Sequence, residues 1–305
     1  GRLPAKPLLV IDEIHKYKKW RNYLKGLYDK NKKQQILVTG SARLDFYRFG
    51  GDSLQGRYHF LRLHPFTFDE LKSTSFSDFQ TLFELGGFPE PFLMGNKIEA
   101  ARWSKEYRSR ILRDDISSIE TIHDLGSAEL VLLRLPELVG SPLSINNISE
   151  DIQTSFKTIK KWLDIFERFY AIYRLLPFGS PKIKAVKKEQ KHYHYDWTLV
   201  KDAGYRFENM IGNHLLKRVH FLEDTQGRDI ELRYFKDNEQ REVDFVVVED
   251  RKPLLFIECK YNETTVSPHL KYLKKKFPQV NSYQLTYNSK KDFLSQDRIR
   301  VCDAF

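Results

Sequence analysis

Two carboxylates and one lysine near the C-terminal end of the chain have the types and spacing needed for metal-dependent chemistry on phosphodiesters. In REVDFVVVEDRKPLLFIECKYNE, thirteen residues separate Asp244 from Glu258, and Lys260 follows Glu258 by two positions. Side chains alternate along a strand, so Glu258 and Lys260 are predicted to share one face while Cys259 points to the other. Carboxylate oxygens bind Mg²⁺, and a nearby ammonium can orient or deprotonate water or stabilise a charged phosphate.

The elements around these residues are predicted to bring them together. The run EVDFVVVE, a turn from Glu249 to Pro253 and the run PLLFIECKY read as a strand, a turn and a paired return strand. A helix around RFENMIGNHLLKRVHFL precedes them, and a helix HLKYLKKKF and a strand near NSYQLTY follow. The sequence therefore predicts a mixed α/β unit with a Mg²⁺ site at Asp244 and Glu258 and with Lys260 beside it.

This arrangement of an aspartate, thirteen residues and E-x-K resembles the PD-(D/E)XK nuclease superfamily, although Val243 stands where that motif has proline. The resemblance implies a restriction-endonuclease-like fold, metal-dependent cleavage of nucleic acid and a further catalytic glutamate on the preceding helix, which is Glu208 here. Some proteins of this kind bind DNA or a protein partner without cutting. A non-cleaving site therefore stays open as an alternative.

A second pair of carboxylates follows a short apolar run near the start of the chain. LLVIDEIHK, residues 8 to 16, has the layout of a Walker B strand, in which one carboxylate binds Mg²⁺ and a second activates water. A helix-compatible segment and a second apolar run at residues 36 to 39 complete a strand, helix, strand pattern. That pattern is typical of a parallel sheet.

The two apolar runs resemble the Walker B and sensor 1 strands of AAA-type ATPases. The resemblance implies that Asp12 binds Mg²⁺, that Glu13 polarises water, and that Thr39 or Ser41 senses the γ-phosphate of ATP. Arg57, or alternatively Arg43, is the implied arginine finger. A phosphate loop G-x-x-x-x-G-K-[S/T] should precede these strands, yet none of the fifteen glycines is followed by lysine. We therefore expect a fragment whose intact parent protein binds and hydrolyses ATP.

The order of motifs resembles a prokaryotic family of AAA-type ATPases with a C-terminal domain of uncharacterised function. The matching segments are LQGRYHFLRLHPFTFDEL, LGGFPEPFL, LRDDI, KHYHYDWTLV, RFENMIGNHLL, EVDFVV and FIECKY. The implied fold class is α/β, with a truncated P-loop parallel-sheet core, a helical and winged-helix middle and a restriction-endonuclease-like mixed α/β end. The implied domains are a truncated AAA-type core (1–72), a helical segment (73–125), a winged helix-turn-helix (126–180) and a PD-(D/E)XK nuclease-like domain (181–305). YHFLRLHPF, residues 58 to 66, is predicted to add another strand.

The middle of the chain carries lysines that could neutralise phosphates. Amphipathic helices between residues 129 and 175, followed by an aromatic run and a basic loop, outline a winged helix-turn-helix. The candidate contacts with nucleic acid lie on the second helix and in the basic loop or wing: Lys157, Lys160, Lys161, Lys182, Lys184, Lys187, Lys188 and Lys191. A charged helix face can equally be only solvated. His192 and His194 are interpreted as ordinary strand residues, because no third metal ligand accompanies them.

Composition limits the remaining classes. The net charge of +10 makes nucleic acid, and DNA first, a plausible partner. Two cysteines, the lack of a signal-peptide pattern and the lack of a long apolar run favour a cytoplasmic protein that does not enter a membrane. The intact protein could form a homo-oligomer. We expect metal-dependent phosphodiester chemistry or DNA binding, with an ATP-controlled, non-cleaving DNA- or protein-binding module and an inert remnant of a disrupted gene as alternatives.

Overall fold

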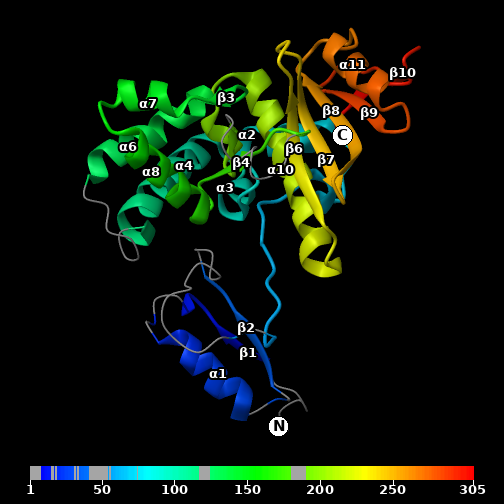
Figure 1. Ribbon diagram of the computed structural model, residues 1–305. Helices are drawn as coiled ribbons and strands as arrows, with labels where there is room; N and C mark the ends of the chain where they lie inside the picture. The colour runs from blue at the N-terminus through cyan, green and yellow to red at the C-terminus, as the bar shows by residue number, and fades with distance from the viewer. Residues whose placement is uncertain are drawn as a thin grey trace.

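The computed structural model describes residues 8–14, 17, 19–30, 32, 34–40, 54, 56–73, 75–116, 124–179 and 190–305 of the chain. Its first unit consists of strand β1 (Leu8–Ile11), helix α1 (Trp20–Lys30) and strand β2 (Gln35–Val38). The two strands pair in parallel, and α1 is the crossover between them that parallel pairing requires (Figure 1). The predicted strand, helix, strand order is confirmed here.

The segment YHFLRLHPF was expected to be a strand, and this prediction is wrong. Residues 58–67 are extended without strand pairing and link the first unit to the rest of the chain (Figure 1). The backbone N–H of Arg62 donates to Asp224 on helix α10 (Ala203–Gln226) at 2.9 Å, and its guanidinium pairs with the same carboxylate. Leu63 is fully exposed, at 100%. No strand of the described part of the chain pairs with this segment, and contacts with α10 hold it instead.

The helical segment that follows is divided between two cores. Its elements are η3 (Phe68–Leu71), α2 (Phe76–Leu85), α3 (Pro89–Met94), α4 (Lys97–Arg110) and the π-helical turn η4 (Ile111–Ile116). Helix α2 packs its Phe79 and Phe83 rings against Tyr287 of the C-terminal unit. Residues of η4 instead join the core of the middle helices. These packing contacts tie the segment to both of its neighbours.

The middle unit combines helices with a three-stranded antiparallel sheet in the order β3-β5-β4. Its elements are α6 (Leu125–Arg134), η5 (Leu135–Leu138), β3 (Pro142–Leu143), α7 (Ile145–Asp151), α8 (Phe156–Arg168), β4 (Ile172–Leu175) and β5 (Gln190–His194). The predicted apolar stripe of α8 is buried in the core of this unit. Because β5 pairs with β4, this sheet extends to His194, beyond the expected boundary at residue 180.

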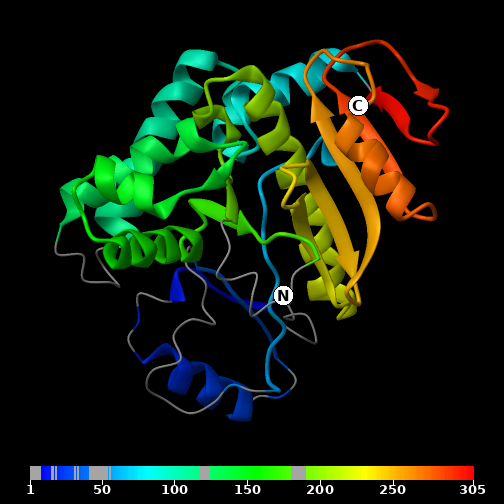
Figure 2. The same cartoon turned by 45° about the horizontal axis from the view of Figure 1, so that its top comes forward.

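The C-terminal unit has a six-stranded mixed sheet in the order β10-β11-β9-β8-β7-β6. The strands are β6 (Ile230–Lys236), β7 (Glu242–Glu249), β8 (Lys252–Lys260), β9 (Asn281–Thr286), β10 (Phe293–Leu294) and β11 (Arg300–Asp303). Helix α10, which follows the short turn η6 (Trp197–Leu199), packs on one face of the sheet, and α11 (Pro268–Lys276) packs on the other (Figure 2). The alternating side chains of β7 supply both cores, Phe245 and Val247 to one and Val246 and Val248 to the other.

The whole is a mixed α/β structure with parallel and antiparallel sheets, as predicted. Within the described ranges, each helix is too short or too polar to traverse a lipid bilayer.

Candidate functional site

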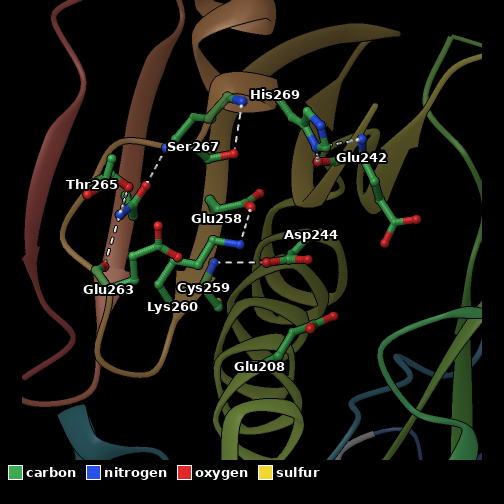
Figure 3. A network of polar contacts seen from close by, with 12 residues as sticks. Glu208, Glu242, Asp244, Glu258, Cys259, Lys260, Glu263, Thr265, Ser267 and His269 are labelled. Atoms are coloured by element: carbon green, nitrogen blue, oxygen red, sulfur yellow. Dashed lines mark hydrogen bonds and ion pairs between the residues drawn. The ribbon is translucent and has the colours of Figure 1, made fainter. Parts of the chain in front are cut away.

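The antiparallel pair β7 and β8 brings Asp244, Glu258 and Lys260 together (Figure 3). Phe245 is the register partner of Ile257, so Asp244 lies beside the stretch that begins at Glu258. The Oδ2 atom of Asp244 accepts the backbone N–H of Cys259 at 2.8 Å, which fixes the carboxylate against β8. The Nζ atom of Lys260 lies 3.0 Å from Oε1 of Glu258. The predicted convergence is therefore what the strand pairing produces.

Two further elements complete this cluster. Helix α10 contributes Glu208, whose side chain points toward Asp244 in Figure 3. Strand β5 contributes Lys191, whose Nζ atom lies 3.1 Å from Oε1 of Glu208 and 3.3 Å from Oδ1 of Asp244. Tyr193, two residues further along β5, donates its hydroxyl to the same oxygen of Glu208 at 2.7 Å. Glu208 thus joins the site, as the resemblance implied, through partners on β5.

Lys191 was expected in the basic loop or wing as a possible phosphate contact, and that placement is wrong, because it lies in strand β5. Its side chain is only 1% exposed, and it also pairs with Glu242 at 2.7 Å. Sequence reasoning missed Lys191, Tyr193 and Glu242 as members of the site. The available signal was the alternation in KHYHY, because Lys191 and Tyr193 share a face of a strand and Tyr193 is an obvious core residue.

Burial and mutual repulsion shift the protonation of these carboxylates. Burial, followed by the charge of Asp244, raises the pKa of Glu258 to about 8, and Lys260 offsets only part of this. The same two causes raise the pKa of Glu208 to about 7 against the opposing effect of Lys191. Burial works to lower the pKa of Lys260, but Glu258 outweighs it and the pKa of Lys260 is raised. Burial likewise works to lower the pKa of Lys191, but the carboxylates around it hold that pKa well above the usual value. Lys191 and Lys260 are therefore both charged at neutral pH. A bound cation would stabilise the ionised form of the two buried carboxylates.

The donor set of Asp244 and Glu258 suits a hard divalent cation such as Mg²⁺. Oε2 of Glu258 is buried and has no hydrogen-bond partner among the described residues, although a buried carboxylate oxygen normally requires one. Over the described residues, no group of three or more histidine, cysteine, aspartate or glutamate side chains is arranged to hold a metal ion. An ion at Asp244 and Glu258 would therefore have two carboxylate ligands, and solvent or substrate oxygens would have to supply the others.

At the other end of the chain, Asp12 and Thr39 lie at the carboxyl ends of β1 and β2. The Thr39 hydroxyl donates to Oδ1 of Asp12, and the Thr39 N–H donates to the carbonyl of Ile11 at 3.0 Å. Glu13, next to Asp12, has a left-handed backbone conformation (φ 52°). The structure thus joins the candidate magnesium ligand to the candidate sensor residue at one edge of the sheet, where parallel strands present ligand-binding groups.

Arg57, the implied arginine finger, lies apart from that edge. Arg57 contacts Asp29 at 3.5 Å, near the last turn of α1. Because α1 runs back from the end of β1 toward the start of β2, this contact is at the opposite end of the unit from Asp12. Ser41 and Arg43 lie outside the described residues.

Some of the candidate nucleic-acid contacts belong to the described residues and others do not. Lys157, Lys160 and Lys161 are exposed on α8. The wing residues Lys182, Lys184, Lys187 and Lys188 lie outside the described part of the chain. His192 and His194 are buried in β5, as expected for ordinary strand residues.

The chain is similar to three protein-family descriptions that together cover most of its length. Residues 2–72 match an AAA domain, which includes Asp12 and Thr39. Residues 76–205 match a domain of unknown function, DUF8612, and residues 203–304, with Glu208, Asp244, Glu258 and Lys260, match another, DUF4143. The AAA domain and DUF4143 matches support an AAA-type ATPase-like family.

Two uncharacterized proteins are similar to the chain. Uncharacterized protein MJ1544 of Methanocaldococcus jannaschii is 24% identical over 311 residues, which cover 92% of this chain and 68% of that protein. An uncharacterized protein of Haemophilus influenzae is 26% identical over 236 residues, which cover 70% of this chain and 58% of that protein. No solved structure matches the chain.

Proposed function

We propose that the C-terminal unit hydrolyses phosphodiester bonds in nucleic acid, most simply DNA, in a metal-dependent way and as part of an AAA-type protein. The observation that carries the proposal is the convergence of Asp244, Glu258 and Lys260 on paired strands, with one buried oxygen of Glu258 left without a partner among the described residues. Few structural roles require a buried carboxylate beside a second carboxylate, whereas a reaction that depends on a bound cation requires such a pair.

The residues of the cluster have separable roles in this reaction. Asp244 and Glu258 would hold Mg²⁺, which when bound supplies charge for the scissile phosphate and a water of lowered pKa. Asp244 is held in place by the N–H of Cys259, and Glu208 by Lys191 and Tyr193. Lys260, whose side chain is 34% exposed, can reach solvent and place its ammonium against the attacking water or a phosphate oxygen.

Cleavage of labelled duplex and single-stranded oligonucleotides with Mg²⁺ or Mn²⁺ tests this function. Replacing Lys260 with methionine (K260M) should lower the cleavage rate by at least about 100-fold, since it removes the solvent-accessible ammonium beside Glu258. The matched control is K252M, which makes the same change at an exposed lysine on the same strand, β8. Equal, metal-independent activity in the parent and in K260M would overturn the proposal.

A second candidate function is binding without cleavage. It is favoured by the ion pairs inside the cluster, because Lys260 already pairs with Glu258, and Lys191 with Glu208 and Asp244. In this case the exposed lysines of α8 would contact DNA, and salt-sensitive binding should survive K260M while neither protein cuts.

In the whole protein, the N-terminal unit would contribute a nucleotide site. The contact between Asp12 and Thr39 supports a role for Asp12 with the Mg²⁺ of ATP, for Glu13 with the attacking water and for Thr39 with the γ-phosphate. ATP hydrolysis, oligomer formation and control of the C-terminal site by nucleotide belong to that longer protein and are expectations for it.

A further inference from the structure

Lys191 is a buried ammonium group enclosed by carboxylates from two different elements. Its Nζ atom lies within 3.3 Å of oxygens of Glu208 on α10 and of Glu242 and Asp244 on β7. The side chain is 1% exposed, so water contributes little to its solvation. A buried charge is retained only where it is paired, and these three carboxylates supply the pairing.

The position of Lys191 is fixed by its own strand. In β5, Lys191 pairs with Leu175 of β4 and with Pro142 of β3, so the ammonium enters the site from a sheet that belongs to the middle unit. Tyr193 on the same face of β5 donates to Glu208 and holds the oxygen that Lys191 contacts. The Lys191 ammonium also lies 6.0 Å from the centre of the Tyr234 ring.

Asp244 divides its two oxygens between two sides of the cluster. Oδ1 faces Lys191, whereas Oδ2 accepts the N–H of Cys259, next to Glu258. On the Glu258 side, Oε2 of Glu258 has no partner among the described residues. On the Glu208 side, the carboxylates already surround a cation. The two sides therefore differ in what they can still bind.

We propose that the Lys191 ammonium is a permanent cation of this site and limits it to one divalent metal ion, bound between Asp244 and Glu258. Without this ammonium, a second ion could bind between Glu208 and Asp244. This inference rests on the proposed metal-dependent function and adds the stoichiometry of the metal. On this inference Lys191 is a positioning residue: from the sheet of the middle unit, it holds the carboxylates of Glu208 and Asp244 in place.

The balance of charge agrees with a single ion. Four carboxylates, Glu208, Glu242, Asp244 and Glu258, meet two ammonium groups, Lys191 and Lys260, and leave a net charge of −2 when all are ionised. Lys236, 3.9 Å from Glu242, would reduce this to −1. One divalent ion brings the net charge close to zero, to 0 without Lys236 and to +1 with it, whereas a second ion beside Lys191 would add two more positive charges in a buried place.

Titration of the metal-free full chain with Mn²⁺, followed by calorimetry and by the electron paramagnetic resonance signal of free Mn²⁺, tests the inference. The parent should bind one ion. K191M, which keeps an apolar stem and removes the charge, should bind two, because a second ion can then take the place of the ammonium among Glu208, Glu242 and Asp244. The matched control is K236M, which removes a half-buried and more distant partner of the same Glu242 and should still bind one ion. Two ions in the parent, or one ion in a folded K191M, would overturn the inference.

Thermal unfolding gives a readout that does not depend on activity. Without metal, K191M should melt at a lower temperature than the parent, because three carboxylates lose their shared cation, and Mn²⁺ should raise its melting temperature more than that of the parent. If K191M is unfolded at every Mn²⁺ concentration, the stoichiometry of the parent alone decides. Absence of any Mn²⁺ binding by the parent would overturn the proposed function together with this inference, whereas one bound ion without cleavage would overturn only the proposed function.

Discussion

At the scale of the single residue, Glu258 is deeply buried while its Oε2 atom has no hydrogen-bond partner among the described residues, and its ionised form therefore lowers the stability of the fold. Glu258 is 4% exposed, and burial and Asp244 raise its pKa from 4.5 to about 8. A raised pKa in the folded state means that the folded protein binds the proton more tightly than the unfolded chain does. Stability from this group is therefore full below pH 4.5 and is lost as the pH rises to about 8.

Replacing Glu258 with glutamine (E258Q) should therefore separate folding from metal binding. In metal-free buffer at pH 8, E258Q should be as stable as the parent or more stable, by on the order of 2 kcal/mol, because glutamine carries no charge to bury. Its affinity for Mn²⁺ should fall by at least about tenfold, since it loses an anionic ligand. Urea unfolding and Mn²⁺ titration measure the two effects.

The control for this change is E150Q, which makes the same substitution at an exposed glutamate of α7 and should alter neither quantity. An E258Q protein that unfolds at much lower urea than the parent, or that keeps the Mn²⁺ affinity of the parent, would contradict the assignment of Glu258.

Individual site residues differed in how well sequence could predict them. Asp244, Glu258 and Lys260 were predictable because the alternation of a strand and the length of one turn fix their relation locally. Lys191 was not, since the surrounding lysine-rich segment has the composition of a solvated loop, and only long-range contacts with α10 and β7 reveal its burial. Pairing across 53 residues, from Lys191 to Asp244, is a tertiary property that local patterns do not encode.

At the scale of the element, helix α8 has one buried and one basic face. Its apolar residues pack into the core of the middle unit, whereas Lys157, Lys160 and Lys161 are exposed. Ser155 caps the helix by accepting the N–H of Thr158, so the three lysines are displayed near the start of a well-formed helix. The N-terminal end of a helix and nearby lysines both attract phosphates.

Replacing the three lysines of α8 with glutamine should weaken the binding of the chain to duplex DNA. If each lysine neutralises one phosphate, the slope of log affinity against log salt should become shallower by about 3. Fluorescence anisotropy at several salt concentrations measures this. The control replaces Lys275 and Lys276, which are exposed on α11, and should leave the slope unchanged. Equal slopes in all three proteins would mean that α8 does not contact DNA.

Elements were predictable where periodicity and tertiary pairing agreed. The stripe of α8 and the alternation of β7 each matched a buried surface, and both elements form as expected. YHFLRLHPF has a similar apolar alternation, but its Arg62 is hydrogen bonded to Asp224 and it pairs with none of the described strands. Strand β5 follows a segment predicted to be a basic loop or wing, yet its aromatic residues pack on β4, with the Tyr173 and Tyr193 rings stacked at 5.5 Å. Pairing partners, more than propensity, decided both outcomes.

At the scale of the whole molecule, three histidines, two of them buried and one half-buried, connect neighbouring elements. His214 on α10 accepts the N–H of Phe68 in η3 at 2.9 Å, and His192 on β5 is hydrogen bonded to the carbonyl of Leu135 at 2.8 Å. His64, in the extended link, contacts His220 of α10 at 2.9 Å. Burial, the largest cause for each, lowers the pKa of His64, His192 and His214 to about 4. All three are therefore neutral in the folded protein at physiological pH.

The assembled molecule should consequently lose stability between pH 6.5 and pH 4. Below pH 6.5 these histidines are protonated in the unfolded chain but stay neutral in the folded protein. Each should therefore lower the free energy of unfolding by about 2 kcal/mol at pH 5. Replacing His192 with glutamine (H192Q), which can still donate to the carbonyl of Leu135, should reduce the change in unfolding free energy between pH 7 and pH 5 by that amount in urea titrations. H59Q, at an exposed histidine, is the matched control and should keep the full change. A parent protein whose stability is constant across this range would contradict this prediction, as would an H192Q protein with the parent's pH dependence. Either result would show that these histidines do not make the stability of the fold depend on pH.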